Sequence, residues 1–251
     1  MSHIISPQNP RLKSLRRLST RRERERSGRF LAEGEDLLIA AEHAGRPALE
    51  GYRLAGSGLG GLHFHDVERS ALGMVSSLGS GTRVIGVYEQ RWQAAVGPLC
   101  VYLHGVADPG NVGAVLRSAQ AFGASSVALG PGCADPHSPK AVRASMGAIF
   151  AVALARVTDL GDLPGERVAL LADAPRTLPQ VRAGRSQGPL TLLVGAERDG
   201  LPPDVVAACE HSARIPIATE SLNAAMAATV ALYELTREGP YAPASSRVRP
   251  S

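Results

Sequence analysis

Short, uninterrupted apolar runs recur through the second half of this chain, and helix-like or turn-like segments separate them. The runs consist mostly of Val, Leu, Ile and Ala, which is typical of strands that are buried on both faces of a sheet. Such strands, alternating with helices, predict an α/β domain with a parallel sheet covered on both sides. The expected strands are Leu99–His104, Ser126–Leu129, Arg167–Ala172, Leu190–Val194 and Ala213–Ile217, and the expected helices are Asn111–Phe122, Pro139–Ile149 and Ser221–Arg237.

A smaller α/β domain is expected ahead of this sheet, over residues 1–90. Its expected strands are Phe30–Ala32, Tyr52–Leu54 and Arg83–Tyr88, and its expected helices are one that starts at Ser6-Pro7 with Ser6 as the N-cap, Glu35–Ala44, and one that begins near Asp66. Residues 91–98 form a plausible linker, 99–238 the larger domain, and the Pro-, Ser- and Arg-rich residues 239–251 an expected disordered tail.

Cysteine usage and hydropathy bear on the cellular setting. Cys100, Cys133 and Cys209 are far apart and form no Cys-x-x-Cys, which fits a reducing compartment. No apolar run is long enough to span a bilayer, and the N-terminus lacks the apolar region of a signal peptide. A soluble, cytoplasmic protein without a membrane partner is therefore expected. His63 and His65 have no cysteine or carboxylate at ligand spacing, so no metal site is predicted.

Positive charge is concentrated near the N-terminus. Residues 11–29 hold nine Arg or Lys side chains against only Glu23 and Glu25. Two interpretations stay open for this segment: an ordinary solvated helix face, or a surface that contacts phosphate groups. Under the second interpretation, the contacting side chains are Arg16, Arg17, Arg21 and Arg22.

The first of three polar clusters, Asn111-Val-Gly-Ala-Val-Leu-Arg117, follows the expected strand Leu99–His104. Asp108-Pro-Gly supplies turn and cap residues, and the start of the next helix favours an anion. On that helix, Arg117 lies about 140° from Val112 on the apolar stripe, at 100° per residue. The alternatives are a surface arginine after an ordinary capped turn and a guanidinium that binds a ligand.

The second cluster, Gly195-Ala-Glu-Arg-Asp-Gly200, ends the strand Leu190–Val194. Gly195 permits a close approach to backbone, and Glu197 is a lone carboxylate immediately after a buried strand. The cluster is neither a Walker loop nor a Gly-x-Gly-x-x-Gly fingerprint, which argues against a nicotinamide enzyme.

The third cluster, Ser221-Leu-Asn223, starts the last helix. Thr219 or Ser221 is expected to be the N-cap. Asn223 would then lie inside the first turn, where Asn is a poor helix former, so its amide is free to orient a ligand.

Read together, these segments resemble a known family. "DPGNVGAVLRSAQAFGA", "LLVGAERDGL" and "IPIATESLNAAMAATVALYE" are similar to the three motifs of the SpoU (TrmH-like) RNA ribose methyltransferases of the SPOUT superfamily. "GCADPHSPKAVRASMGAIF" also resembles that family, and residues 1–90 resemble the small, ribosomal-protein-like RNA-binding domain that many members carry.

The resemblance implies a catalytic domain with a C-terminal trefoil knot, a homodimer, and S-adenosylmethionine as the methyl donor. It also implies that Gly195, Ile215 and Leu222 contact the cofactor, and that the polar catalytic site consists of Asn111, Arg117, Glu197, Ser221 and Asn223. In the family Arg117 is the proposed base, but a guanidinium with a pKa above about 12 stays protonated. Binding of the adjacent phosphate and of the developing alkoxide is the role that fits its chemistry.

One departure from the family pattern concerns the loop Ile217–Ser221, which is short and lacks a glycine, so cofactor contacts there are expected to differ. The leading hypothesis is an RNA 2′-O-ribose methyltransferase that acts on ribosomal RNA. A transfer RNA 2′-O-methyltransferase and a non-catalytic RNA-binding protein that retains the fold are the alternatives.

Overall fold

The computed structural model describes residues 3–61, 63–77, 81–184, 188–219 and 221–237, and these residues form two compact units. The first unit contains residues 1–91 and 135–151, and the second contains residues 92–134 and 152–251. Each unit has its own sheet and is described separately below. The predicted tail over 239–251 lies outside the described residues. No helix in the described ranges is long and apolar enough to cross a membrane.

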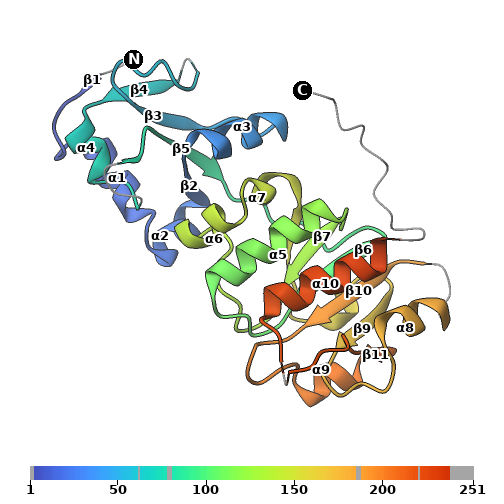
Figure 1. Ribbon diagram of the computed structural model, residues 1–251. Coiled ribbons are helices and arrows are strands. Elements are labelled where there is room, and N and C mark those ends of the chain that lie inside the picture. The colour runs from blue at the N-terminus through green and yellow to red at the C-terminus, as the bar shows by residue number, and fades with distance from the viewer. Residues whose placement is uncertain (1–2, 62, 78–80, 185–187, 220, 238–251) are drawn as a thin grey trace, which may run out of the picture. The chain divides into compact units, whose positions relative to one another are not determined.

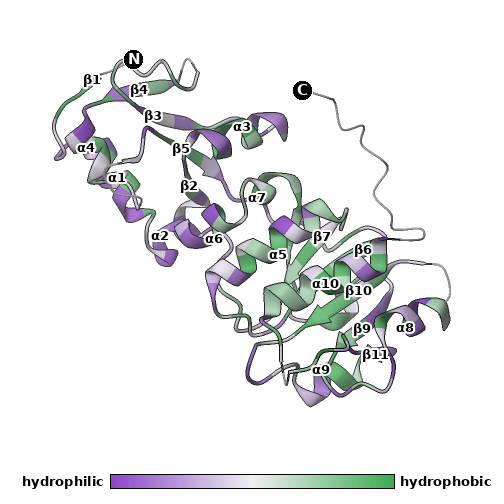
Figure 2. Ribbon diagram, in the orientation of Figure 1, coloured by the Kyte–Doolittle hydropathy of each residue, from purple (hydrophilic) through white to green (hydrophobic). Residues whose placement is uncertain are grey.

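The second unit is built on a six-stranded sheet in which every pairing is parallel. Its spatial order is β11 (His211–Ala213), β9 (Glu166–Leu170), β10 (Leu190–Val194), β6 (Leu99–Leu103), β7 (Ser126–Leu129) and β8 (Ala153–Arg156). Every residue of β6, β7 and β10 is buried, as continuous apolar runs require, and Figure 2 shows β6 and β10 as apolar ribbons. The predicted parallel α/β fold is therefore confirmed.

Helices cover this sheet. They are α5 (Pro109–Ala121), α8 (Leu178–Gly184), α9 (Pro203–Ala207) and α10 (Ala224–Thr236), with the 3-10 turn Leu160–Asp162. α5 and α10 lie side by side (Figure 1), joined by a hydrogen bond of 2.6 Å between the hydroxyls of Ser118 and Thr229. Strand β8 was not among the predicted strands, and β11 ends at Ala213 rather than at Ile217.

The first unit has a mixed five-stranded sheet in the order β1 (His3–Ile4), β4 (Phe64–Val67), β3 (Glu50–Leu54), β5 (Val84–Glu89) and β2 (Arg29–Glu33). β5 runs antiparallel to both β3 and β2. Its helices are α1 (Pro10–Arg17), α2 (Arg21–Ser27), α3 (Glu35–His43), α4 (Arg69–Gly73), α6 (Pro139–Ala144) and α7 (Ala148–Ala151).

Three helix predictions were wrong at their boundaries. The first helix begins at Pro10 with Asn9 as its cap, because the Asn-Pro pair supplies the same signal as Ser6-Pro7. Asp66 lies in strand β4, and α4 starts at Arg69. The predicted helix Pro139–Ile149 is split into α6 and α7, because Met146 and Gly147 adopt φ angles of 48° and 93°.

The segment 135–151 groups with the first unit by its contacts, although the sequence places it inside the domain 99–238. Asp135 forms an ion pair with Arg24 of α2, with a nitrogen–oxygen distance of 2.7 Å. Phe150 packs against the rings of Phe30 and Tyr88, with centroid distances of 5.9 and 4.7 Å. These contacts join residues that are far apart in the chain, so local sequence pattern carries no signal of them.

Candidate active site

The ends of strands β6 and β10 lie next to each other in the second unit. Leu103 pairs with Val194, and the backbone N–H of His104 donates to the Val194 carbonyl at 2.9 Å. Because all strands of this sheet are parallel, their carboxyl ends share one edge, where open α/β sheets place their ligands. The clusters that begin at Asn111 and Gly195 therefore meet at this edge.

A chain of hydrogen bonds links the three polar clusters. The Asn223 amide donates to Asn111 Oδ1 at 3.1 Å, and the Asn111 amide donates to Glu197 Oε1. Asn223 Oδ1 in turn accepts from the backbone N–H groups of Ala225 at 3.0 Å and Met226 at 3.3 Å. The helix terminus can only donate, so it sets the orientation of both amides and directs the Asn111 amide donor toward Glu197.

Asn223 is the N-cap of α10, which corrects the prediction that Thr219 or Ser221 has this role. The Thr219 hydroxyl instead donates to the Ser221 carbonyl at 3.3 Å. Asn223 is therefore not a poor residue inside a helix. It is one of the best N-cap residues, and its side-chain N–H group reaches across to α5.

Asn111 is held from the other side by the start of α5. Asp108 is the N-cap of this helix and accepts from the Asn111 backbone N–H at 3.1 Å. Pro109 occupies the first helical position, where its missing N–H costs nothing. Cap, proline and side-chain contacts together leave Asn111 little freedom.

Arg117 stands apart from this network. Its side chain is exposed and has no hydrogen-bond or ion-pair partner within the described ranges. It lies six positions after Asn111, which places it about 9 Å further along α5 and about 120° around the helix. Asn111, Glu197 and Asn223 are therefore brought together, whereas Arg117 presents an unpaired guanidinium on a neighbouring face of α5.

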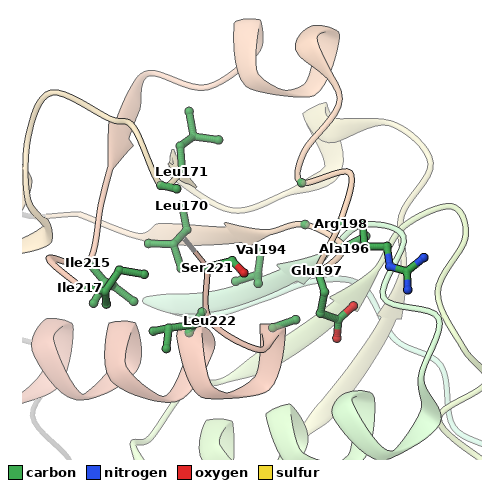
Figure 3. A pocket seen from close by; sticks show the side chains of 15 residues that line it. Leu170, Leu171, Val194, Ala196, Glu197, Arg198, Ile215, Ile217, Ser221 and Leu222 are labelled. Carbon is green, nitrogen blue, oxygen red and sulfur yellow. The ribbon is translucent and has the colours of Figure 1, made fainter. Parts of the chain in front are cut away.

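A cavity of about 260 Å³ opens beside the network. Figure 3 shows Leu170, Val194, Ile215 and Leu222 gathered around it, with the Glu197 carboxylate at its other end. Gly195 and Ser221 also line the cavity, so four of the five predicted polar residues lie either in the network or on the cavity wall. Glu220, in the shortened loop, lies outside the described residues.

Gly195 is required by the chain itself. A Cβ atom at this position would lie 2.2 Å from the carbonyl carbon of Gly200 and 2.5 Å from the nitrogen of Leu201. Ala196 and Gly200 exchange backbone hydrogen bonds of 3.2 and 3.0 Å, which fold residues 196–200 back against the strand end. The close approach that the sequence predicts at Gly195 is thus made by the protein's own backbone.

Sequence reasoning missed the contribution of β9. Leu170, Leu171 and Ala172 line the cavity where this strand ends, next to β10. The rule that led to Asn111 and Glu197, namely inspection of residues just beyond parallel strands, applies to them equally. They were overlooked because they are apolar and carry no reactive group.

Tyr102 and His104 lie at the same edge of the sheet. The Tyr102 hydroxyl is 3.0 Å from His104 Nδ1, and burial raises the pKa of Tyr102 to about 12. The phenol therefore keeps its proton at neutral pH, and one hydrogen bond joins its oxygen to the His104 ring.

The four arginines predicted to contact RNA have different surroundings in the first unit. Arg16 donates to the Pro7 carbonyl at 2.9 Å, and Arg21 pairs with Glu25 at 2.9 Å. Arg17 and Arg22 are exposed and make no side-chain hydrogen bond or ion pair in the described part of the chain, although the charges of both help to lower the pKa of Glu23. Arg17 and Arg22 are therefore the two of these four side chains with charge available to a ligand.

His65 on β4 lies between a carboxylate and a guanidinium. Its Nε2 is 3.1 Å from Glu50 and 2.9 Å from Arg11. Across the described residues there is no group of three or more His, Cys, Asp and Glu side chains that could hold an ion.

Comparison with known proteins places these features in a family. A family model described as the SpoU rRNA Methylase family matches residues 98–233, and one described as an MRM3-like substrate binding domain matches residues 9–55. An uncharacterised tRNA/rRNA methyltransferase of Synechocystis is 30% identical over 263 residues, covering 95% of this chain and 94% of that protein.

Two further relatives have more specific descriptions. The 23S rRNA (guanosine(2553)-2′-O)-methyltransferase RlmP of Bacillus subtilis is 26% identical, covering 94% of this chain and 99% of its own length. The crystal structure of an AdoMet-bound rRNA methyltransferase from Sinorhizobium meliloti superimposes with a TM-score of 0.81 at 29% identity, covering 94% of this chain and 97% of that one.

Proposed function

This chain belongs to the SpoU rRNA methylase family, and from that premise we propose that it transfers a methyl group from S-adenosylmethionine to a ribose 2′-hydroxyl of ribosomal RNA. The observation that carries the proposal is the cavity at the strand ends, which adjoins the Glu197–Asn111–Asn223 network. Both lie within residues 98–233, which match the family model.

The cavity suits the proposed cofactor. Aliphatic side chains from β9, β10 and the segment after β11 form most of its wall, which fits an apolar nucleoside face. Glu197 and Ser221 add acceptors and a hydroxyl at the polar end, where ribose or amino groups of a ligand find partners. Gly195, Ile215 and Leu222 are the residues proposed to contact the cofactor, in line with the family resemblance.

Catalysis requires positioning more than bond activation by the protein. When bound, S-adenosylmethionine supplies a methyl group on a positively charged sulfur, which is already an activated donor. The chain must hold a ribose hydroxyl in line with that methyl group and stabilise the charge that develops on its oxygen. The proposed polar site for this task is Asn111, Arg117, Glu197, Ser221 and Asn223.

Arg117 is proposed to bind the phosphate next to the target ribose and to stabilise the developing alkoxide. Its lack of an internal partner among the described residues leaves all five N–H donors of the guanidinium for the substrate. A permanently protonated guanidinium suits an anion and does not suit a general base. Loss of the hydroxyl proton is assigned instead to a neighbouring acceptor or to the phosphate itself.

Ribosomal RNA is the proposed substrate because the match is not confined to the catalytic unit. Residues 9–55 match a substrate-binding domain, and RlmP, named for 23S rRNA, aligns over nearly the whole chain. A protein working on ribosomal RNA is also expected in the cytoplasm, without membrane or metal partners.

A homodimer is proposed from the outer face of α10. Met226, Val230 and Tyr233 follow one another at helical spacing and are 63%, 38% and 49% exposed. An apolar stripe of this kind on a helix is typical of a surface that packs against another protein. Met226→Glu should convert the dimer to a monomer in analytical ultracentrifugation; an unchanged sedimentation coefficient in a dimeric protein would place the interface elsewhere.

The trefoil knot of the family is proposed for the segment between β11 and α10. Arg214 donates through its backbone to the Arg176 carbonyl at 2.9 Å and through its side chain to the Ala174 carbonyl. The chain therefore runs close beside residues 174–177 after leaving β11, as a threaded segment would.

The test of the proposed function compares 2′-O-methylation across ribosomal and transfer RNA in cells with and without the gene. One ribosomal ribose should lose its methyl group completely when the gene is deleted and regain it on complementation. Loss confined to transfer RNA would overturn the substrate, and no change together with no calorimetric binding of S-adenosylmethionine at millimolar concentration would favour a non-catalytic RNA-binding protein.

A further inference from the structure

A second cavity, of about 340 Å³, lies entirely within the first unit. It is bounded by α1 and α2 on one side and by strands β2, β3 and β5 on the other. Four arginines, two glutamates and two serines line it together with apolar side chains, and we call it the basic pocket. Its polar lining includes Arg17, Arg29, Arg11, Glu50, Tyr52 and Ser14.

The exposed members of the lining carry unbalanced positive charge. Arg11 pairs with Glu50 at 2.6 Å, and Arg26 pairs with Glu23 at 2.5 Å. Arg17 and Arg29 are both exposed and make no side-chain hydrogen bond or ion pair among the described residues, although the charge of Arg17 helps to lower the pKa of Glu23. Two guanidinium groups at the mouth are therefore available to an anion, and each can bind phosphate oxygens with two parallel hydrogen bonds.

The buried members of the lining are three aliphatic side chains and Tyr52, whose hydroxyl is hydrogen-bonded to Glu50. Leu15, Leu18 and Val87 are buried, and the Tyr52 ring is almost wholly covered. Burial and the hydrogen bond to Glu50 raise the pKa of Tyr52, so its hydroxyl remains a donor. The basic pocket thus combines an apolar wall with a cationic rim.

Glu50 gives the wall a carboxylate that keeps its charge. Burial works against its ionisation, but hydrogen bonds from Tyr52, Arg11 and His65 outweigh that effect and lower its pKa. Its contacts are 2.6 Å to Arg11 and 3.1 Å to His65. An ionised carboxylate beside an apolar wall can accept the N–H groups of a nucleobase or a ribose hydroxyl.

We propose that the basic pocket binds one unpaired ribonucleotide of the RNA substrate, with its phosphate on Arg17 and Arg29 and its base against the apolar wall. This inference rests on the proposed function, since it assumes an RNA substrate, and it names where the first unit would hold that RNA. A cavity between helices and strands does not admit a base-paired strand, whose bases are stacked inside the helix, whereas an unstacked nucleotide can enter. The positive charge would attract paired and unpaired RNA alike, so the preference for an unpaired nucleotide comes from the cavity.

The test measures binding of the full-length protein to a 12-nucleotide, mixed-sequence, single-stranded RNA with a 5′ fluorescein label, and to the corresponding blunt duplex. Arg17→Ala/Arg29→Ala should weaken binding of the single strand about ten-fold, as expected when hydrogen bonds to a charged group are removed. The slope of log K against log salt should fall by about 0.7 for each phosphate that the variant no longer binds. Lys13→Ala/Arg69→Ala is the matched control, because it removes two exposed charges that do not line the pocket.

A second variant separates the cavity from its charge. Ser14 is an exposed lining residue, so Ser14→Phe fills the mouth while every charge stays. Single-strand binding should fall about ten-fold with an unchanged affinity for the duplex, since only the nucleotide inside the pocket is displaced. Equal losses for single strand and duplex, or no loss in either pocket variant, would overturn the proposal.

Two controls keep this inference distinct from the proposed function. All variants should bind S-adenosylmethionine as the wild type does in calorimetry, since the cofactor cavity is in the other unit. If the wild type methylates RNA and the pocket variants bind RNA normally, the pocket proposal fails alone. If a mixture of free nucleoside monophosphates displaces the single strand at micromolar concentration, the pocket serves free nucleotides and the proposal is likewise overturned.

Discussion

Two arginines in the two units have opposite surroundings. Arg24 in the first unit has a side chain only 4% exposed, paired with Asp135 at 2.7 Å and donating to the carbonyls of Leu18 and Ser19 at 2.8 Å each. Arg117 in the second unit is exposed and has no partner within the described ranges. A guanidinium whose donors are mostly bound inside the protein supports the fold, whereas one whose donors are unused is available to an anionic ligand.

The comparison extends to the neighbours of each arginine. Around Arg24, burial opposes ionisation of Asp135, but hydrogen bonds from His137 and the charge of Arg24 outweigh it and hold its pKa well below the ordinary range. In the unit of Arg117, the Asn111 amide is hydrogen-bonded to Glu197 and to Asn223, and the Asn223 amide also accepts from the start of α10. Replacement of Arg24 should therefore be felt in stability, and replacement of Arg117 in activity.

The largest effect is expected from Arg24→Met. This change leaves the buried Asp135 without its counter-charge, so the free energy of unfolding should fall by about 3–5 kcal/mol. Urea denaturation measures the loss, and the double variant Arg24→Met/Asp135→Asn should recover much of it, because no uncompensated charge remains. A loss below about 1 kcal/mol would show that the pair is not a main support of this unit.

The same pair should show a specific pH dependence. Since the folded-state pKa of Asp135 is lowered, its contribution is present at neutral pH and is lost as the pH falls below the ordinary value near 3.9. The stability difference between the wild type and Asp135→Asn should therefore shrink steadily in urea titrations from about pH 5 downward. A difference that stays constant down to about pH 2 would contradict this linkage.

The next effect is expected from Arg117→Ala. If this guanidinium stabilises charge in the transition state, kcat should fall on the order of 10²–10³-fold. Calorimetry should give wild-type binding of S-adenosylmethionine, and the free energy of unfolding should stay within about 0.5 kcal/mol of the wild type, as for other exposed sites. Full activity in this variant would remove Arg117 from the proposed site.

Asn223 allows the fold and the site to be separated at one position. Asn223→Ala removes the N-cap of α10 and should cost about 0.5–2 kcal/mol of stability. Asn223→Asp keeps an acceptor for the helix N–H groups but cannot donate to Asn111, so stability should be retained while activity falls, on the order of 10-fold. Equal activity of Asn223→Asp and the wild type would show that Asn223 acts only as the N-cap of α10.

The smallest effects are expected at the N-terminal arginines. Reversal of Arg16, Arg17, Arg21 and Arg22 to glutamate should weaken RNA binding and flatten its salt dependence. Arg17 and Arg22 should account for most of the change, by about 0.7 of slope for each phosphate of a single strand that they bind, since Arg16 and Arg21 have internal partners. An unchanged slope in fluorescence titrations would identify this segment as a solvated face.

Local pattern was sufficient wherever neighbours in sequence decide the structure. The strands β6, β7 and β10 followed from apolar runs, because a strand buried on both faces must be apolar throughout. The grouping of Asn111 with Glu197 followed from their positions just beyond parallel strands. The division of the helix after Pro139 did not, since a left-handed φ at Met146 has no clear sequence signal.

The sequence by itself thus determined the parallel α/β class, the family motifs, and the meeting of Asn111 with Glu197 at the end of the sheet. Tertiary structure decided the roles that depend on distant partners: Asn223 as a cap bound to Asn111, Gly195 against the backbone of Gly200, Arg24 paired with Asp135, and Arg17 with Arg29 at the mouth of a cavity. The physical reason is the distance along the chain over which each kind of interaction acts. Apolar periodicity and capping act within one or two turns of chain, whereas a side chain's charge is satisfied or left free by residues that only folding brings near it.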